Sequence, residues 1–319
     1  MKIYEIIIKP HSFFITPLQG DILFGSLCWQ LNNMGHNLQE LLKDYGEYPF
    51  MAASSGFLFS EKDNKYLLPK PQCPSYFMNK GSLPEKKEKD KCFFKVSADN
   101  IINLNKPEFE QGLRHSEIQE VRSHNSINRL TGTTGNGGEF APYYARCFMH
   151  DCRWKIAVFI AIDEIRISPE TIKSAMENIG RSGYGKRASA GYGHFSVEQI
   201  RPSPLWHNKD GSRRNFAGCN AIYALSAFVP SEQELKGNAG FYYQPITKYG
   251  KHGDVMALCK NPFKKPVIMA DCSSVMAFKD KLPENCIIGR AIKGLSYESE
   301  ETVMQGYAIC LPCSLEIYQ

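Results

Sequence analysis

The stretch GYGKRASAGYG at residues 183–193 consists of two Gly-Tyr-Gly triplets that enclose five residues, among them Lys186, Arg187 and Ser189. Glycine loses more conformational entropy on folding than any other residue, so four glycines in eleven positions indicate a backbone that turns sharply or lies very close to another group. Two adjacent cations favour an anionic ligand as that group. The stretch therefore predicts a loop that binds an anion.

The elements on either side of this loop distinguish three kinds of glycine-rich site. Ser168 begins a predicted helix that Gly180 ends, and HFSVEQI (194–200) predicts a strand after the loop. A dinucleotide-binding fingerprint needs the opposite order, and a Walker loop needs Ser or Thr after its lysine, whereas Lys186 precedes Arg187. The order favours a loop at the edge of a ferredoxin-like sheet, where N–H groups and cations contact a sugar–phosphate chain.

Two alternatives stay open for this loop. Tyr184 and Tyr192 either stack on bases or anchor the loop in the core, and a flexible turn with no ligand is the simplest interpretation of the glycines. The neighbouring charges favour a ligand, because residues 181–214 contain seven cations but only Glu198 and Asp210 as carboxylates. The seven cations are Arg181, Lys186, Arg187, Arg201, Lys209, Arg213 and Arg214.

Apolar patterns upstream of the loop predict further strands and one more helix. KIYEIIIKP (2–10) and RWKIAVFIAID (153–163) have the β-branched and apolar content of buried strands, and GFLFSEKDNKYLLP (56–69) predicts two short strands around a turn. GDILFGSLCWQL (20–31) has the apolar spacing of one helical face, with Asp21 as the expected N-cap.

These elements predict an α+β protein with two ferredoxin-like, RRM-like domains. The order β-α-β-β-α-β belongs to the first domain, residues 1–200, and an insertion at about 72–150 interrupts it. RPSPLWHNKDGSRR (201–214) is rich in charges and turn residues and predicts a linker. The smaller second domain, within 201–319, consists mainly of predicted strands.

The composition sets limits on the function. A chain of 319 residues that is 43% hydrophobic buries a large core, and a net charge of +5 does not by itself define a nucleic-acid binder. No apolar run reaches the roughly 18 residues of a membrane span, and no secretory signal begins the chain, so we expect a cytoplasmic protein with no membrane partner. Its cysteines are then expected to be reduced and structural.

The cysteine spacings give a weak signal for metal. Cys310 and Cys313 form a C-x-x-C pair, and Cys147 precedes Cys152 by five positions. A structural zinc site needs four ligands, and spacing alone does not bring these two pairs together. We therefore predict no metal and no other cofactor, and leave open whether Cys310 and Cys313 bind one.

The two glycine triplets resemble the carboxy-terminal glycine-rich motif of the RAMP proteins of CRISPR systems. Within that superfamily, GDILFGSLCWQL (20–31) is similar to the amino-terminal helix of the fourth Csm subunit of type III-A effector complexes, and HNSINRLTGTTGNGGEF (124–140) is similar to its thumb. GYAICLP (306–312) also fits this family. The resemblance covers most of the chain, although residues 72–115 match no part of the family.

The resemblance implies a non-catalytic RNA-binding subunit. Such a subunit binds and caps the repeat-derived 5′ handle of the crRNA, and it links the large Cas10-type subunit, which has a cyclase-like palm, to the backbone of Csm3-type subunits. Phe24 and Gly25 would lie in the first helix beneath the sheet. Carried over by position, the handle site would comprise Gly183, Gly185, Lys186, Arg187, Ser189, Gly191, Tyr192 and Gly193.

The stretch that is similar to the thumb predicts a β-hairpin inserted into the first domain. Gly-Asn-Gly-Gly at residues 135–138 strongly favours a hairpin turn. Leu130 or Phe140 would then wedge between bases, and an ordinary polar surface loop is the alternative. The side chains expected to contact phosphates and sugar hydroxyls are Arg122, His124, Asn125, Asn128 and Arg129.

Two other functions stay open. The related guide-processing RAMP enzymes cleave RNA without a metal by acid–base chemistry, for which His11, His124 and His194 are the candidates near the expected RNA-facing elements. The pair His150–Asp151 occurs in metal-dependent phosphohydrolases, but the further ligands of such sites are not recognisable. A scaffold that binds only protein is the third possibility.

Overall fold

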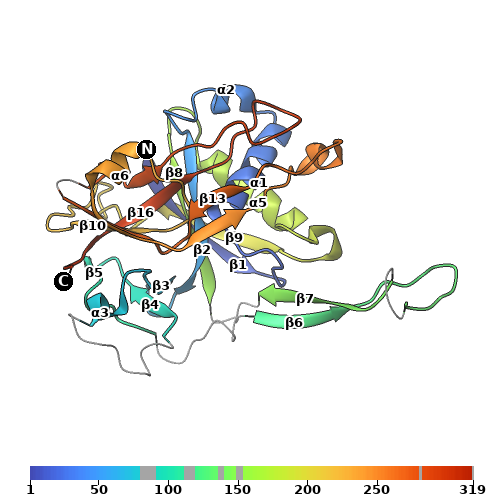
Figure 1. Cartoon of the computed structure of the whole chain (residues 1–319), viewed down its shortest axis with the longest axis horizontal. Coiled ribbons are helices and arrows are strands. Elements are labelled where there is room, and N and C mark those ends of the chain that lie inside the picture. Colours follow the sequence, from blue (N-terminus) through green and yellow to red (C-terminus); the bar gives the residue numbers. More distant parts are fainter. Residues whose placement is uncertain (80–90, 111–118, 136–139, 149–153, 280–281, 318–319) are drawn as a thin grey trace.

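The computed structural model describes residues 1–79, 91–110, 119–135, 140–148, 154–279 and 282–317. It is a mixed α+β structure with several antiparallel sheets and few helices. Among the described residues, no helix is both long enough and apolar enough to cross a membrane. Figure 1 shows a main body from which a two-stranded ribbon projects.

The first sheet is built around three central strands that are almost entirely buried. Its strand order is β4-β3-β2-β8-β1-β9, and all neighbouring pairs run antiparallel. Continuous apolar runs in β1 and β8 account for their burial on both faces. The strands are β1 (Lys2–Pro10), β2 (Met51–Ser60), β3 (Lys65–Pro69), β4 (Phe93–Val96), β8 (Lys155–Ile162) and β9 (Phe195–Pro202).

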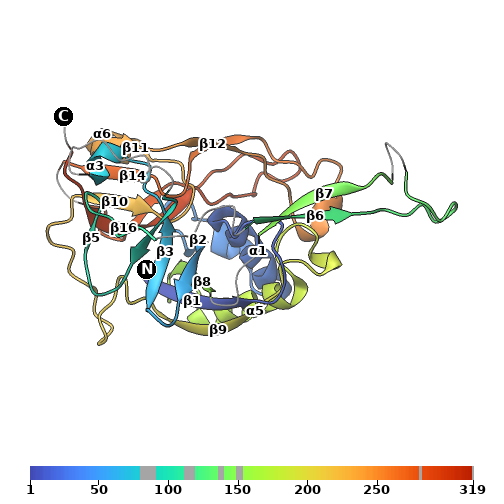
Figure 2. The same cartoon turned by 90° about the horizontal axis from the view of Figure 1, so that it is seen from below.

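Two helices cover one face of this sheet. α1 (Gly20–Asn33) packs on β2, α5 (Pro169–Ser182) packs on β9, and the two helices contact each other (Figure 2). Ser168 caps α5 as the sequence predicts, because its hydroxyl accepts a hydrogen bond from the Thr171 N–H. α1 starts one residue before Asp21, with Gln19 at the N-cap position. The Asp21 carboxylate instead pairs with Lys248, 3.1 Å away.

The second sheet and the smaller elements occupy the rest of the body. The order of the second sheet is β11-β14-β10-β16-β15, and β5 pairs with β16. Its strands are β5 (Ile102–Asn103), β10 (Ala221–Ala224), β11 (Asn238–Tyr242), β14 (Val275–Phe278), β15 (Ile287–Gly289) and β16 (Tyr307–Ser314). The short helices are α2 (Leu38–Leu42), α3 (Ser75–Met78) and α6 (Glu232–Gly237).

Two separate two-stranded sheets complete the structure. One pairs β6 (Gln119–His124) with β7 (Tyr143–Phe148), and the other pairs β12 (Pro245–Lys248) with β13 (Val267–Ala270). The β6–β7 ribbon projects from the body in Figures 1 and 2. Two 3₁₀ turns, Ala188–Ala190 and Asp254–Leu258, lie in the connections.

A continuous hydrophobic core joins the two large sheets. One cluster of buried side chains contains residues from β1 and β8 as well as from β10 and β16. Trp206, within the predicted linker 201–214, is fully buried; its ring lies 5.1 Å from that of Phe159, and its Nε1–H donates to the Cys310 carbonyl at 3.1 Å. The stretch therefore connects the sheets but also packs between them, because burying an indole outweighs its polar surroundings.

We expect His207 to make stability depend on pH. Its Nε2 accepts a hydrogen bond from the Ile3 N–H, so the ring is neutral in the fold, and burial next to Lys2 and Arg213 lowers the pKa of His207 below its ordinary 6.5. The unfolded chain therefore gains a proton first, and stability falls as the pH drops below 6.5. Urea midpoints at pH 7.5 and 5.5 should differ less for His207→Gln than for the wild type; an equal difference would contradict this assignment.

Candidate nucleic-acid interface

The two glycine triplets lie against each other and close the loop. The Tyr184 N–H donates to the Gly193 carbonyl at 2.9 Å, which pairs the first triplet with the second. Gly193 has φ +74, and a Cβ there would lie 2.2 Å from the Tyr184 oxygen. Gly183 has φ +88, and a Cβ there would lie 2.6 Å from the Tyr192 oxygen. Only glycine fits at both positions, which explains why glycines flank each tyrosine.

The connection between β1 and α1 fixes the inner side of the loop. The Lys186 N–H donates to Thr16 Oγ1 at 2.9 Å, and the Gly193 N–H donates to the Phe13 carbonyl at 2.8 Å. Gly185 packs so closely that a Cβ would lie 2.6 Å from the Thr16 Cβ. The loop is therefore held in one conformation at several points, and a flexible turn does not describe it.

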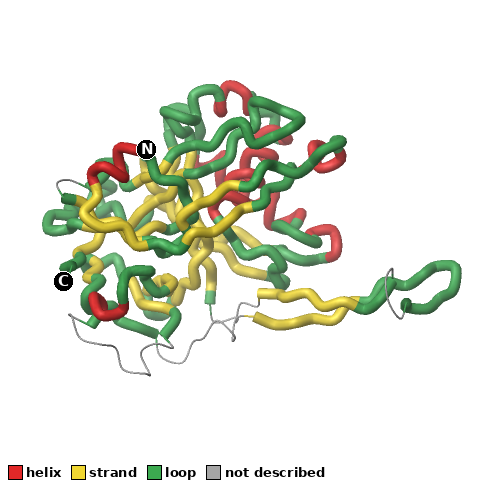
Figure 3. Tube along the Cα trace, in the orientation of Figure 1, coloured by secondary structure: helices red, strands yellow, loops and turns green. Residues whose placement is uncertain are grey.

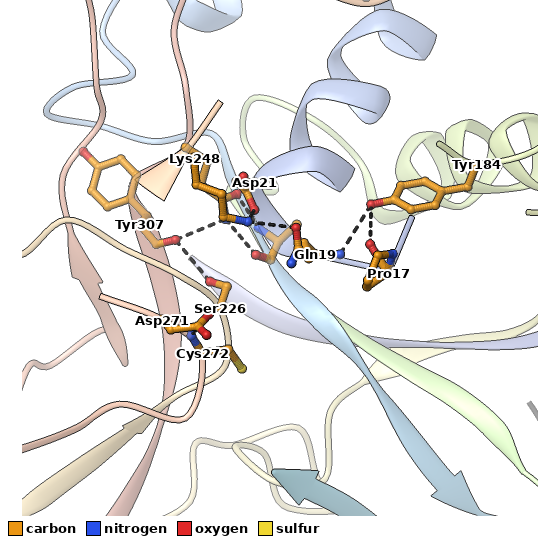
Figure 4. A network of polar contacts seen from close by, with 11 residues as sticks. Pro17, Gln19, Asp21, Tyr184, Ser226, Lys248, Asp271, Cys272 and Tyr307 are labelled. Carbon is orange, nitrogen blue, oxygen red and sulfur yellow. Dashed lines mark hydrogen bonds and ion pairs between the residues drawn. The ribbon is translucent and has the colours of Figure 1, made fainter. Parts of the chain in front are cut away.

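Tyr184 anchors the loop in the core. Its side chain is buried and its hydroxyl donates to the Pro17 carbonyl at 3.3 Å and accepts from the Gln19 N–H at 3.4 Å. The Gln19 side chain accepts in turn from Lys248 Nζ at 2.8 Å, which extends the network to β12 (Figure 4). Burial raises the pKa of Tyr184, so the phenol stays protonated. Of the two roles predicted for the tyrosines, this one serves as an anchor.

The cations and the serine lie on the other side of the loop. Lys186, Ser189 and Gly191 are exposed, and Arg187 is half-buried. Arg187 has φ +64, a left-handed conformation that costs a non-glycine residue about 1–2 kcal/mol. Its guanidinium lies over the ring of Tyr143 on β7, 4.6 Å from the centroid. This contact directs a strained cation toward the base of the β6–β7 ribbon, by which we mean the paired strands Gln119–His124 and Tyr143–Phe148.

The base of the ribbon and the loop form one surface. His124 stacks on Tyr143 with ring centroids 5.4 Å apart, and its Nε2 shares a hydrogen bond with the Tyr192 hydroxyl at 3.2 Å. Arg122 lies 3.7 Å from the centroid of the Phe13 ring and is also paired with Glu120. Cations, aromatic rings and hydroxyls thus alternate across this surface, an arrangement suited to phosphates and stacked bases.

The remaining predicted residues lie farther along the ribbon. Asn125, Asn128 and Arg129 follow the end of β6 in the sequence. Figure 3 shows that the connection beyond the two strands of the ribbon extends away from the body. The Asn128 side chain accepts from the Leu130 N–H at 2.9 Å and so stabilises a local turn. The Leu130 side chain is 96% exposed. Residues 136–139, which include most of the predicted Gly-Asn-Gly-Gly turn, lie outside the described residues.

Among the described residues, no hydrogen bond or ring contact joins the side chains of the candidate histidines His11, His124 and His194 to one another. His11 Nε2 shares a hydrogen bond with Ser196 Oγ at 2.9 Å, and the His11 N–H donates to the His194 carbonyl at 2.8 Å. His124, in contrast, contacts Tyr143 and Tyr192. The pair at residues 150–151 lies outside the described residues.

The cysteine pair in β16 is buried. Cys310 and Cys313 lie three positions apart on one strand, so their side chains point to opposite faces of the sheet. Burial raises the pKa of both thiols well above the ordinary value. Within the described part of the chain, no three or more His, Cys, Asp and Glu side chains are placed to hold a metal ion.

Sequence reasoning did not identify three residues of this surface. Tyr143 stacks with His124 and Arg187, Thr16 holds the loop, and Phe13 lies under Arg122. Thr16 and Phe13 precede the motif by about 170 positions, and no local pattern connects them with it. Tyr143 on β7 could have been proposed as part of this surface only if the register between β6 and β7 had been known.

Solved structures of other proteins share the fold of this chain. No protein-family model matches the chain, and no curated protein matches it in sequence. One similar solved structure is the Csm3-Csm4 subcomplex in the type III-A CRISPR-Cas interference complex, with a TM-score of 0.60, 15% identity, and 98% of this chain and 99% of that chain covered. Another is a Csm1-Csm4 cassette in complex with cA4, with a TM-score of 0.57, 13% identity and 100% of both chains covered.

Csm4 is the subunit that these two assemblies share, and the matched chains are Csm4. At this level of identity the likeness establishes the fold. The chain has a fold like that of Csm4, and the predicted resemblance to the fourth Csm subunit is confirmed at the level of the fold.

Proposed function

We propose that this chain is a non-catalytic subunit of a type III-A CRISPR effector complex that binds and caps the 5′ handle of the crRNA. The observation that carries the proposal is the two-sided construction of the loop at 183–193. Tyr184 and Thr16 hold its inner side, while Lys186 and Ser189 are exposed on its outer side. A pre-ordered, cation-bearing loop binds a phosphate chain without first losing its own conformational entropy.

The proposed contacts divide into two kinds. Lys186 and Arg187 supply charge to phosphates, and backbone N–H groups and Ser189 supply hydrogen bonds. The cluster of His124, Tyr143 and Tyr192 offers ring faces on which splayed handle bases stack. Affinity then comes mainly from the phosphates and selectivity from the bases.

The distal part of the ribbon extends the proposed site. Asn125, Asn128 and Arg129 would contact phosphates and sugar hydroxyls beyond the base of the ribbon, and Leu130, exposed at 96%, would wedge between neighbouring bases. The β6–β7 ribbon has this role as the inserted thumb of the RAMP fold. Its projection away from the body supports the proposal (Figure 1).

The architecture that we propose is two RAMP-type ferredoxin-like domains. In the first domain, residues 1–200, the strands β1, β2, β8 and β9 are the first to fourth strands of the β-α-β-β-α-β order. Their arrangement in the sheet, β9-β1-β8-β2, is therefore 4-1-3-2. In the second, 201–319, the order β16-β10-β14-β11 has the same pattern with α6 as its helix. Both strand orders support this assignment.

The proposed partners follow from the assemblies of the similar chains. Those chains were solved with Csm3 in one case and with Csm1 in the other. We propose that this chain likewise links a large Cas10-type subunit to a backbone of Csm3-type subunits, in the cytoplasm. A cap at one end of a filament explains why it needs two protein surfaces as well as an RNA site.

The direct test is to purify the chain from cells that express its CRISPR array and to sequence the bound nucleic acid. We expect RNA of guide length that begins with the repeat-derived handle. In binding assays at fixed salt, a handle-bearing RNA should compete better than a shuffled RNA of equal length. Purified chain without RNA, together with equal affinity for both RNAs, would contradict the proposal.

A cleavage assay separates this function from the endoribonuclease alternative. Repeat RNA is incubated with the pure chain in EDTA, and the expected result is intact RNA. Cleavage that is lost in His11→Ala or His124→Ala would instead show a processing enzyme. The His124→Ala variant also tests stacking, because it should weaken RNA binding by about tenfold if a base stacks there.

A further inference from the structure

The β12–β13 pair is the start of a longer two-stranded ribbon. Beyond the ends of the strands, the Lys264 N–H donates to the Gly250 carbonyl at 2.9 Å, and Lys251 forms a β-bridge with Phe263. The 3₁₀ turn Asp254–Leu258 lies in the connection at its end. Side chains therefore alternate between two faces along both strands.

The inner face of this ribbon is covered. Lys248 pairs with Asp21 at the start of α1, and the His252 ring shares a hydrogen bond with Ser296 at 2.8 Å. Ile246 packs against a buried cluster that includes Met269. These contacts fix the ribbon to the body of the protein.

The outer face carries large apolar side chains that are exposed. Tyr249 is 79% exposed, Phe263 61% and Ile268 71%, and Leu258 near the turn is 89% exposed. Tyr297 lies next to this face, where Lys265 Nζ is 5.4 Å from its ring centroid. A face that stays in water normally carries polar residues at these alternate positions, and a contiguous apolar patch marks a binding surface.

The charges of the outer face have one sign. The two strands of the ribbon, 245–251 and 262–268, contain no Asp or Glu, and two of their four lysines, Lys251 and Lys265, are exposed on this face, whereas Lys248 belongs to the inner face. Lys251 Nζ lies 5.7 Å from the centroid of the Phe263 ring, so cations and aromatic rings alternate on the surface. We infer that this face docks a protein subunit whose complementary surface is apolar and carries carboxylates. This inference rests on the proposed function, because it identifies one of the two protein surfaces that a filament cap needs.

A protein partner fits the face better than RNA does. RNA-binding sheets combine exposed rings with arginine side chains, and the ribbon from 245 to 268 has the exposed rings of Tyr249 and Phe263 but no arginine. Its exposed members include the aliphatic Ile268, Leu258 and Val255. Aliphatic groups bind apolar protein surfaces but offer no ring on which a base can stack.

The test uses two double variants that remove the same residue types. Tyr249→Thr with Ile268→Thr changes the outer face, and Tyr48→Thr with Ile165→Thr is the control, in which the two side chains are 70% and 96% exposed elsewhere on the protein. Each variant and the wild type are titrated separately with a large subunit, with a backbone subunit and with handle RNA. Urea midpoints equal to that of the wild type establish that both variants fold.

We expect the outer-face variant to bind one of the two subunits at least tenfold more weakly, while the control variant and the RNA affinity stay unchanged. Wild-type binding to a subunit with no loss in the variant would overturn this inference alone. If neither subunit binds the wild type, both this inference and the proposed function fail. A loss of RNA affinity, or a wild-type homodimer that the variant does not form, would also overturn it.

Discussion

A chain with Lys186→Ala and Arg187→Ala is expected to bind handle-bearing RNA roughly 100-fold more weakly than the wild type. Each cation makes a hydrogen bond to a charged phosphate in the proposed site, worth about 1.5 kcal/mol, or about tenfold in affinity. Alanine at 187 keeps the Cβ that Arg187 already places at φ +64, so the backbone strain is unchanged. Folding stability is therefore not expected to account for the loss.

The salt dependence of RNA binding by the same double variant tests independently whether Lys186 and Arg187 contact phosphates. Loss of two phosphate contacts should reduce the slope of log K against log salt concentration by about 1.4 on single-stranded RNA. The control removes one lysine and one arginine from exposed positions near α6 and β15, Lys236→Ala with Arg290→Ala, and should leave the slope unchanged. Equal slopes for all three proteins would show that the loop at 183–193 does not contact phosphates.

The second large effect is expected at Gly193. In Gly193→Ala the new Cβ would lie 2.2 Å from the Tyr184 oxygen and 2.6 Å from the Tyr184 nitrogen. These are backbone atoms, so no side-chain rotation relieves the overlap and the pairing of the two triplets must open. We expect a loss of about 3–5 kcal/mol in the free energy of unfolding, together with weaker RNA binding.

Gly191→Ala is the matched control for this prediction. Gly191 also has a positive φ, +87, but an added Cβ there has no heavy atom within 4 Å. It should therefore lose only the 1–2 kcal/mol that a left-handed conformation costs. Urea unfolding of both variants measures the difference. Equal losses would mean that backbone strain, and not the close contact between the triplets, determines the need for glycine.

Local patterns predicted both helices and five of the six strands of the first sheet, but not β4 (Phe93–Val96), which lies within the predicted insertion. Ser168 and the apolar spacing of α5 define that helix because capping and burial act within one turn of the chain. The runs in β1 and β8 were identifiable because both strands are buried on both faces. The pattern of Asp21 indicated a cap, but its carboxylate pairs with Lys248, more than 200 positions away. Capping rules consider only neighbouring residues and therefore cannot predict a partner so distant in the sequence.

The candidate site was predictable in its residues but not in its assembly. The motif at 183–193 and the side chains of β6 were both found in the sequence, whereas the contact between them depends on Tyr143 and Tyr192. That contact requires the register of β6 with β7 and the position of the ribbon on the body. In the second half the sequence predicted strands where β10 and β14 lie, but the sheet order β11-β14-β10-β16-β15 and the pairing of β5 with β16 depend on long-range contacts that no local pattern gives.

The continuous core has a consequence for how the chain matures during translation. Gln305 is fully buried, where its amide donates to the Ala53 carbonyl at 2.7 Å and its oxygen accepts from the Ala53 N–H at 2.8 Å. β5 pairs with β16, which spans residues 307–314. Contacts of such sequence separation cannot form until the ribosome has released those residues. Until then the Ala53 N–H and carbonyl lack their Gln305 partner, so we expect β2 to complete its contacts late in folding, and apolar surface that stays exposed until then favours aggregation.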